Sequence, residues 1–341
     1  MSRKVFLVLM SLVLLLPALL APFGADMPNR RAGTQAEDAL FSDNPALWLT
    51  DRLALRTLMT TARAQLLQAA GESGNDRVIA GRNGFLFLAD TLDDYMGKNV
   101  MTDEEISRLC GNVLAFSQAL SGRLIVLIAP DKAAIYPENM PVRYLKGRGE
   151  SSLDRVQQAL LKGGITVLDA KNLLLAGKEE GQLYFSRDTH WNARGARMIA
   201  LELARMTGDE DFLKAVKNIP DEYENGRAGD LLLLCKPGGE PDEPDAAPAF
   251  RPVFQAAKPY RTLNDMTIQT TSKESGISLF VLRDSFGERL FPYLAGCAGR
   301  MTFSRVLDGA KTNAQDAGAE IVVLEIAERN LRLLLDAKLS E

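Results

Sequence analysis

Histidine is almost absent from this sequence, since His190 is the only one among 341 residues. That scarcity excludes a metal site built from several imidazoles, and any imidazole chemistry has to use His190. Cysteine is scarce as well. The three cysteines, Cys110, Cys235 and Cys297, are an odd number without Cys-x-x-Cys spacing, which argues against a zinc ribbon and a disulfide framework. One pair could still form a bridge.

Basic clusters are also missing. The chain has 40 Lys and Arg residues against 44 Asp and Glu residues, a formal charge of -4, and the cations are scattered. We therefore expect no nucleic-acid partner. The content of 46% hydrophobic and 25% charged residues excludes a disordered or collagen-like chain. The length indicates one large or two modest domains.

One long apolar run stands at the N-terminus. Arg3 and Lys4 precede a run over residues 5–20 that is uncharged and apolar apart from Ser11. A basic start before an apolar stretch is typical of a secretory signal, and about twenty apolar residues also suffice for an uncleaved membrane anchor. A buried core helix is the third reading of residues 1–25. Either of the first two readings predicts that the remaining chain is exported. Residues 26–75 read as a linker followed by an N-terminal helix.

Strands and helices are predicted to alternate over residues 76–341. Continuous apolar or β-branched runs predict strands buried on both faces, at 124–129, 165–168, 277–282 and 321–326. Helical spacing and start signals predict intervening helices at 102–120, 151–162 and 192–206. The alternation predicts a layered α/β domain with a mostly parallel sheet. Residues 220–275 are rich in proline and acids, and we expect a loop or small β insertion there.

Polar residues follow several of these strands. In an open parallel sheet, ligands bind outside the carboxyl ends of the strands. Ser285 comes soon after the run 277–282 and just before a helix-forming stretch. A serine at such a turn exposes its hydroxyl, and nearby backbone N–H groups can hold an oxyanion. Ser285 is therefore a candidate nucleophile.

A serine nucleophile needs a base and a group that orients the base. His190 is the candidate base because it is the only histidine, and Asp188 lies two residues before it. An extended segment or a turn can bring that carboxylate beside the imidazole. The alternative reading is structural, because aspartates and serines at these positions also cap helices.

Other residues near the strand ends are candidates for substrate binding, and they are Lys132, Tyr136, Trp191, Arg283 and Arg329. Each could instead be a surface or ion-paired residue. Glu325 lies inside an apolar strand, so it needs a partner, and an arginine at 187, 283 or 329 could supply one. No residue pattern calls for a metal ion or an organic cofactor. The cysteines are expected to pack as small apolar residues.

Several blocks carry a family resemblance. They are GRNGFLFL at 81–88, APDKAAIYPENMP at 129–141, LYFSRDTHWNARGA at 183–196, GDL at 229–231, VLRDSFGERLFPYLA at 281–295 and IVVLEIAERNL at 321–331. The sequence resembles the SGNH-hydrolase-like alginate O-acetyltransferase family (AlgX- and AlgJ-like proteins) and the related DHHW proteins. The resemblance implies a three-layer α/β/α fold whose triad is Asp188, His190 and Ser285. The serine block follows the Asp–His block, the reverse of the order in ordinary GDSL esterases, as in the circularly permuted alginate acetyltransferases.

The resemblance also implies a function. Family members acetylate polysaccharide hydroxyls outside the cytoplasmic membrane, and a membrane-bound O-acyltransferase usually supplies the acetyl groups. We therefore expect an exported serine O-acetyltransferase at the periplasmic face of the inner membrane, acting on a cell-envelope or secreted polysaccharide. Two alternatives stay open. One is a carbohydrate O-acetyl esterase with the same triad, and the other is a non-catalytic component of a polysaccharide modification or secretion complex.

Overall fold

A computed structural model describes residues 75–219, 221–225, 228–236, 243–248 and 254–341. The predicted signal or anchor at 1–25 and the linker and helix at 26–75 lie outside these ranges, apart from residue 75. Among the described residues, no helix combines the length and the apolar character that a membrane crossing requires.

The core of the protein is one seven-stranded sheet with the order β4-β3-β11-β9-β10-β8-β7. The first five strands in this order run parallel, whereas β8 and β7 are antiparallel to their neighbours. The strands of this sheet span Thr166–Leu168 (β4), Arg123–Ala129 (β3), Ile321–Ala327 (β11), Ser278–Leu282 (β9), Arg300–Ser304 (β10), Thr267–Thr271 (β8) and Gln255–Ala256 (β7). The expected mostly parallel sheet is confirmed.

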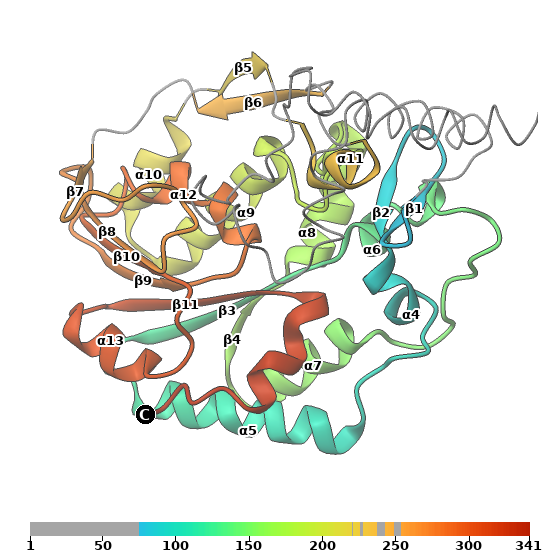
Figure 1. Cartoon of the computed structure of the whole chain (residues 1–341). Coiled ribbons are helices and arrows are strands. Elements are labelled where there is room, and N and C mark those ends of the chain that lie inside the picture. Colours follow the sequence, from blue (N-terminus) through green and yellow to red (C-terminus); the bar gives the residue numbers. More distant parts are fainter. Residues whose placement is uncertain (1–74, 220, 226–227, 237–242, 249–253) are drawn as a thin grey trace, which may run out of the picture.

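The apolar runs of the central strands are continuous because both faces of the sheet are covered. In β3, Ile125 and Leu127 pack into the core above the sheet, while Leu124 and Val126 pack into the core below it. Successive side chains of a strand point to opposite faces, so only an unbroken apolar run fills both cores. The fold is therefore the expected three-layer α/β/α arrangement (Figure 1).

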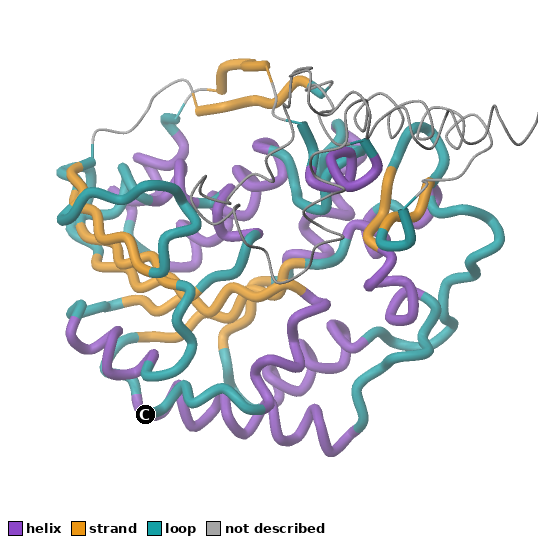
Figure 2. The backbone as a smooth tube through the Cα atoms, in the orientation of Figure 1, coloured by secondary structure: helices purple, strands orange, loops and turns teal. Residues whose placement is uncertain are grey.

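Helices form the two outer layers (Figures 1 and 2). The lower layer contains Asp103–Ala119 (α5), Ser152–Lys162 (α7), Ala310–Asp316 (α13) and the 3-10 helix Glu328–Leu335 (η7). The upper layer contains Ala170–Gly177 (α8), Ala193–Thr207 (α9), Glu210–Lys217 (α10) and Phe291–Leu294 (α12). Capping boxes at Thr102 and Ser151 begin α5 and α7, and Asn192 caps α9. These side chains accept hydrogen bonds from backbone N–H groups that the helix cannot satisfy itself.

Short elements complete the described chain. Val78–Ala80 (β1) and Leu86–Leu88 (β2) form a hairpin through Asn83 and Gly84, which both have positive φ. The other short helices are Ala89–Thr91 (η3), Leu92–Tyr95 (α4), Lys132–Ile135 (α6), Pro137–Asn139 (η4), Lys178–Glu180 (η5) and Phe286–Arg289 (η6). Turn residues with positive φ suit a two-residue hairpin loop.

The segment 220–275 is more integrated than a simple insertion. Its first part forms a separate two-stranded sheet, Asp221–Asn225 (β5) with Pro244–Pro248 (β6), and the helix Asp230–Cys235 (α11). Its last part supplies β7 and β8 to the main sheet. The strand β8 alternates exposed and buried residues because it lies near the sheet edge, a weaker sequence signal than a continuous run.

The three thiols are unpaired and lie in different regions. Cys297 packs in the upper core, Cys110 against the lower core, and Cys235 in a small cluster beside the β1–β2 hairpin.

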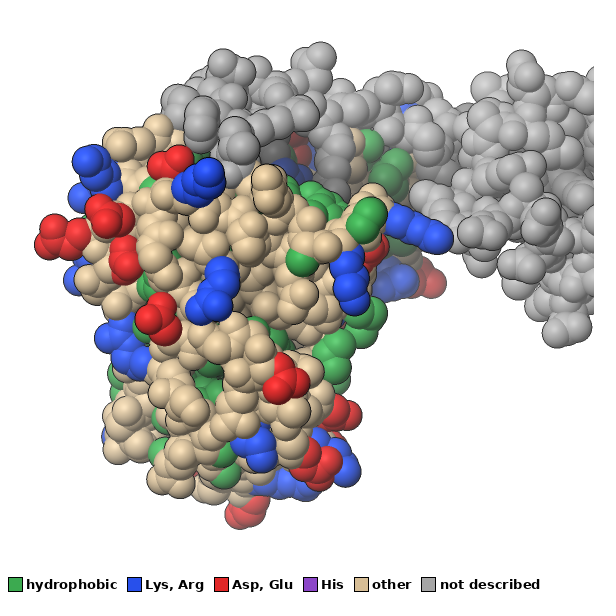
Figure 3. Space-filling model, turned by 90° about the vertical axis from the view of Figure 1, so that its left-hand side faces the viewer, with side chains coloured by type: hydrophobic (Ala, Val, Ile, Leu, Met, Phe, Trp, Pro, Cys, Tyr) green, Lys and Arg blue, Asp and Glu red, His purple; other side chains and the backbone are tan. Residues whose placement is uncertain are grey.

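On the face shown in Figure 3, Lys and Arg side chains are interspersed with Asp and Glu side chains. That face therefore carries no field of one sign.

Candidate active site

Ser285 lies in the turn between β9 and η6, at the carboxyl end of the parallel sheet. The carboxylate of Asp284 fixes this turn. One oxygen accepts from the Phe286 N–H at 2.9 Å, and the other accepts from the Ala327 N–H and the Asn330 amide, both at 2.8 Å. Asp284 therefore caps the turn and also fastens it to the end of β11.

Glu325, in the neighbouring strand β11, also binds this turn. It is 1% exposed, and its Oε2 accepts the Asp284 N–H at 2.9 Å. Burial and the nearby charge of Asp284 raise the pKa of Glu325 well above its usual range, which favours the neutral acid. Two of the three arginines that could have been its partner are bound elsewhere, because Arg283 pairs with Glu288 at 3.4 Å and Arg329 with Asp131 at 2.9 Å. Glu325 is therefore accommodated in the core by the Asp284 N–H and by its own raised pKa.

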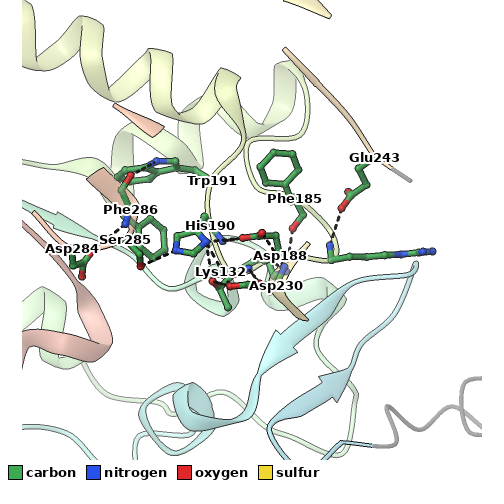
Figure 4. Close-up of polar contacts among 12 residues, drawn as sticks. Lys132, Phe185, Asp188, His190, Trp191, Asp230, Glu243, Asp284, Ser285 and Phe286 are labelled. Carbon is green, nitrogen blue, oxygen red and sulfur yellow. Dashed lines mark hydrogen bonds and ion pairs between the residues drawn. The ribbon is translucent and has the colours of Figure 1, made fainter. Parts of the chain in front are cut away.

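Ser285, His190 and Asp188 lie in one row (Figure 4). The His190 Nε2 lies 2.8 Å from the Ser285 Oγ, and the His190 Nδ1 lies 2.6 Å from the Asp188 Oδ1. His190 and Ser285 are 95 positions apart in the chain, so only the fold brings them together. The three residues that the sequence singles out for nucleophile, base and orienting carboxylate are thus in hydrogen-bond contact.

The environment of Asp188 determines the direction of these hydrogen bonds. Its side chain is 3% exposed, and burial alone would raise its pKa. The hydrogen bonds and charge of His190, with the Asp230 N–H at 3.1 Å, outweigh burial and hold the pKa of Asp188 well below its usual range. An ionised carboxylate can only accept, so Nδ1 carries the imidazole proton and Nε2 is free to accept from the serine hydroxyl.

Lys132 lies under the loop that carries Asp188 and His190. Its ammonium donates to the carbonyls of Phe185, Ser186 and Asp188 at 3.1, 2.9 and 2.7 Å. An ammonium has three N–H donors, and all three are used here. Burial lowers the pKa of Lys132 to about 7, although neighbouring acids, Asp188 first among them, oppose that shift. The expected substrate contact is therefore corrected to a structural one.

Three other predicted substrate residues are also buried in structural contacts. Tyr136 accepts the Leu183 N–H at 2.8 Å, and the Trp191 indole donates to the Phe286 carbonyl at 3.1 Å. Arg283 is 3% exposed, packs over the Phe303 ring and binds Glu288. These side chains position the segments around Ser285 and His190, and their polar groups face protein partners rather than an open surface.

Arg329 keeps a partly accessible place. Its side chain is 17% exposed, donates to the Asp131 Oδ1 at 2.9 Å and lies over the Phe286 ring. It lines a small cavity together with Thr189, the neighbour of His190. Among the five predicted substrate residues, Arg329 is the one whose position suits contact with a bound molecule.

Sequence reasoning missed a second carboxylate beside the imidazole. Asp230 accepts from the Thr189 N–H and hydroxyl at 2.8 and 2.6 Å, and its Oδ2 lies 3.7 Å from the His190 Nδ1. Gly229 was the available signal. A Cβ there would lie 2.2 Å from the Arg187 carbonyl, so this Gly-Asp pair is needed for close packing against the Asp–His loop.

Glu243 was missed as well, and it accepts the N–H groups of Ser186 and Arg187 at 2.7 and 2.9 Å (Figure 4). It lies in the acidic, proline-rich segment 220–275, where many carboxylates look alike in the sequence. Together with Lys132 it fixes the loop from both sides, the cation on its carbonyls and the carboxylate on its N–H groups.

Asp188, His190 and Asp230 also form the one group in the described part of the chain whose acidic and imidazole ligand atoms lie within 4.8 Å of one another. Each Asp188 oxygen and both His190 nitrogens already have hydrogen-bond partners within the protein. The arrangement is thus a complete hydrogen-bond network, and it matches proton transfer at Ser285 better than a metal centre.

Replacing Lys132 tests its role under the loop. We expect Lys132→Met to lower the free energy of unfolding by about 3 kcal/mol, because buried carbonyls lose charge-assisted donors. Amide hydrogen exchange over residues 185–190 should accelerate, and urea denaturation gives the stability. Lys162→Met, at the exposed end of α7, is the matched control. Unchanged stability and exchange in Lys132→Met would refute the structural role.

Comparisons with known proteins identify the family of the chain. The family model described as SGNH hydrolase-like domain, acetyltransferase AlgX, matches residues 78–248, which is half of the chain. A curated relative, the probable alginate O-acetylase AlgJ of Azotobacter vinelandii, is 25% identical over 156 residues. That alignment covers 45% of this chain and 39% of the relative, so the chain spans about two fifths of the relative's length.

Two solved structures share the fold. A DHHW family protein from Eubacterium siraeum is 15% identical with a TM-score of 0.55, over 76% of this chain and 97% of that chain. Bacillus cereus PatB1 is 14% identical with a TM-score of 0.56, over 74% and 96%. With its parallel α/β/α fold and the family match across the Asp–His segment, the chain belongs to the SGNH hydrolase-like acetyltransferase family of AlgX.

Proposed function

We propose that this protein is an exported serine O-acetyltransferase that acetylates a hydroxyl of a cell-envelope or secreted polysaccharide. The single observation that carries the proposal is the unbroken contact from Asp188 through His190 to Ser285, at 2.6 and 2.8 Å. Such a relay makes a serine hydroxyl nucleophilic. Membership of an acetyltransferase family supports acetyl as the transferred group.

The reaction proceeds in two half-steps. The Ser285 Oγ attacks the carbonyl carbon of the acetyl donor while the His190 Nε2 takes the hydroxyl proton. The intermediate then expels the donor's leaving group, which receives that proton, and acetyl-Ser285 remains. In the second half-step a sugar hydroxyl gives its proton to Nε2 and attacks the acetyl carbon. The sugar ester departs and the proton returns to Ser285. Asp188 stabilises the imidazolium formed in each half-step.

The negative charge that develops on the acetyl oxygen needs donors. The Phe286 N–H is already used by Asp284, so the N–H groups of Ser285 and Gly287 are the better candidates for this role. A Cβ at residue 287 would lie 2.6 Å from the Arg283 side chain and 2.9 Å from the Glu325 Oε2. Glycine therefore lets the turn pack closely, which supports a rigid arrangement of these donors.

Removing either reacting side chain tests the relay. Ser285→Ala and His190→Ala should each reduce hydrolysis of a chromogenic aryl acetate by about three orders of magnitude or more, since a triad fails when one member is lost. Ser107→Ala on the exposed face of α5 is the control and should keep full activity. Near-normal rates in His190→Ala would show that another group is the base.

Arg329 tests transfer against hydrolysis. A transferase must hold a sugar hydroxyl near the His190 Nε2 more effectively than bulk water, and positioning supplies that advantage. We expect Arg329→Ala to reduce acetyl transfer to an oligosaccharide about tenfold more than aryl acetate hydrolysis. The ratio of the two rates is the readout, because a loss of folded protein cancels in it.

Arg332→Ala is the control for that comparison, because Arg332 lies on η7 like Arg329 but pairs with Glu105 of α5, away from the relay. Equal losses of transfer and hydrolysis in Arg329→Ala would assign Arg329 to the fold or to the acyl-enzyme step. If no oligosaccharide competes with water in the wild type, the carbohydrate O-acetyl esterase replaces the transferase.

Export to the periplasmic face of the inner membrane is part of the proposal, with a membrane-bound O-acyltransferase as the acetyl supplier. Its basis is the basic start and apolar run within residues 1–25. The protein should fractionate with the inner membrane and keep its N-terminus, as measured by N-terminal sequencing of the membrane fraction. A soluble periplasmic form that begins near Asp26 would instead indicate a cleaved signal.

A further inference from the structure

A cavity of about 210 Å³ lies at the carboxyl ends of β3 and β11. Its walls come from α4, from the turn between β3 and α6, from the loop 146–150 and from the start of η7. A second, small cavity shares Thr91, Asp131 and Ala133 with it and is also lined by Thr189 and Arg329. The two cavities are therefore neighbours, and the smaller one, of about 10 Å³, reaches Thr189 beside His190.

Asp131 is the residue that ties this cavity to the site, and one of its oxygens lacks a partner. Its side chain is 8% exposed, and its Oδ1 accepts from Arg329. The Asp131 Oδ2 is fully buried without a hydrogen bond inside the protein. A buried acceptor without a donor is costly, so a ligand that brings an O–H or N–H group to it gains that energy on binding.

The charge around the cavity is the second observation. Five carboxylates and three cations line it, and Asp154 and Lys171 pair with each other at 2.6 Å. Four carboxylates then remain against two cations of the lining, and one of these carboxylates, Asp131, is bound to Arg329 at 2.9 Å. Burial raises the pKa of Asp131 to about 6 and that of Glu328 to about 8, which means that the ionised form of each acid is disfavoured. A ligand carboxylate would add a further negative charge to this pair.

The size of the cavity limits the ligand. A volume of about 210 Å³ corresponds to the liquid share of roughly seven water molecules, which is the scale of one sugar ring rather than a polymer segment. The opening lies along the loop 146–150, which includes the exposed Gly149, so a longer chain can continue outward from it.

We propose that this cavity is an acceptor subsite that holds one sugar residue next to the residue being acetylated, and that this sugar is neutral or amino-bearing rather than a uronate. Its hydroxyl or amino groups donate to the carboxylates of Asp131 and Asp94. The inference rests on the proposed transferase function and specifies its substrate class. It predicts an acceptor different from the alginate in the names of the curated relatives.

Binding without chemistry tests the proposal. The full chain with Ser285→Ala is titrated calorimetrically with three probes of equal length, a neutral cello-oligosaccharide, a glucosamine oligomer and a mannuronate oligomer. We expect at least one of the first two to bind about tenfold or more tightly than the mannuronate oligomer. Equal or tighter binding of the mannuronate oligomer, or no binding of any probe, overturns the proposal.

Two glycine variants locate the binding. Gly149 lines the cavity, and a Cβ there meets no heavy atom within 4 Å, so Gly149→Leu places a side chain at the opening without backbone strain. It should weaken binding of the preferred probe about tenfold. Gly276→Leu is the matched control, since a Cβ at Gly276 is equally unobstructed. Gly276 precedes β9 and so lies at the amino end of that strand, whereas the site lies at the carboxyl end. Unchanged binding in Gly149→Leu refutes this location.

The outcome is separable from the fate of the proposed function. Aryl acetate hydrolysis in the chain with Ser285 intact reports the triad alone, whereas the titrations use a chain that cannot form an acetyl-serine. If hydrolysis proves independent of Ser285, the catalytic proposal fails. If hydrolysis depends on Ser285 but the titrations favour the mannuronate oligomer, only the substrate class fails.

Discussion

The geometry of the site depends on the hydrogen bonds that the Lys132 ammonium donates to the loop 185–190. Asp188 and His190 lie on a loop without a regular backbone ladder of its own, so its carbonyls need donors from elsewhere. One buried ammonium supplies three of them from the first turn after β3. Because Lys132 follows directly after β3, these hydrogen bonds attach the loop to the central sheet.

The serine side of the site uses the opposite chemistry. There a carboxylate, Asp284, collects N–H groups from its own turn and from the end of β11, and the buried acid Glu325 holds the Asp284 N–H. Both halves of the relay are thus tied to the carboxyl ends of neighbouring parallel strands, β3 on one side and β9 with β11 on the other. This preorganisation suits a reaction whose charges develop only in the transition state.

The relay and the proposed acceptor subsite lie side by side at the carboxyl ends of the parallel strands. Arg329 binds Asp131 at 2.9 Å; Asp131 lines the larger cavity, whereas Arg329 lines the smaller one together with Thr189, the neighbour of His190. The relay treats every acetyl ester alike, whereas the acidic cavity can select the acceptor by charge. In the proposed function, the acetyl chemistry and the choice of acceptor reside in different residues of one fold, so a likeness to alginate O-acetylases does not determine the acceptor.

Local patterns in the sequence were sufficient for four of the five parallel strands, for α5, α7 and α9, and for the candidates Ser285, His190 and Asp188. Each of these has a short-range signal: an apolar run, a capping residue or a unique imidazole. The parallel strand β10 and the helices α8 and α10 were not predicted. Tertiary structure decided the rest. Lys132, Tyr136, Trp191 and Arg283 have the composition of substrate-binding residues, yet their partners are main-chain groups or acids that become neighbours only on folding. Asp230 and Glu243 join the site from a segment without periodicity. Burial and partner choice are properties of the packed chain, and no local pattern encodes them.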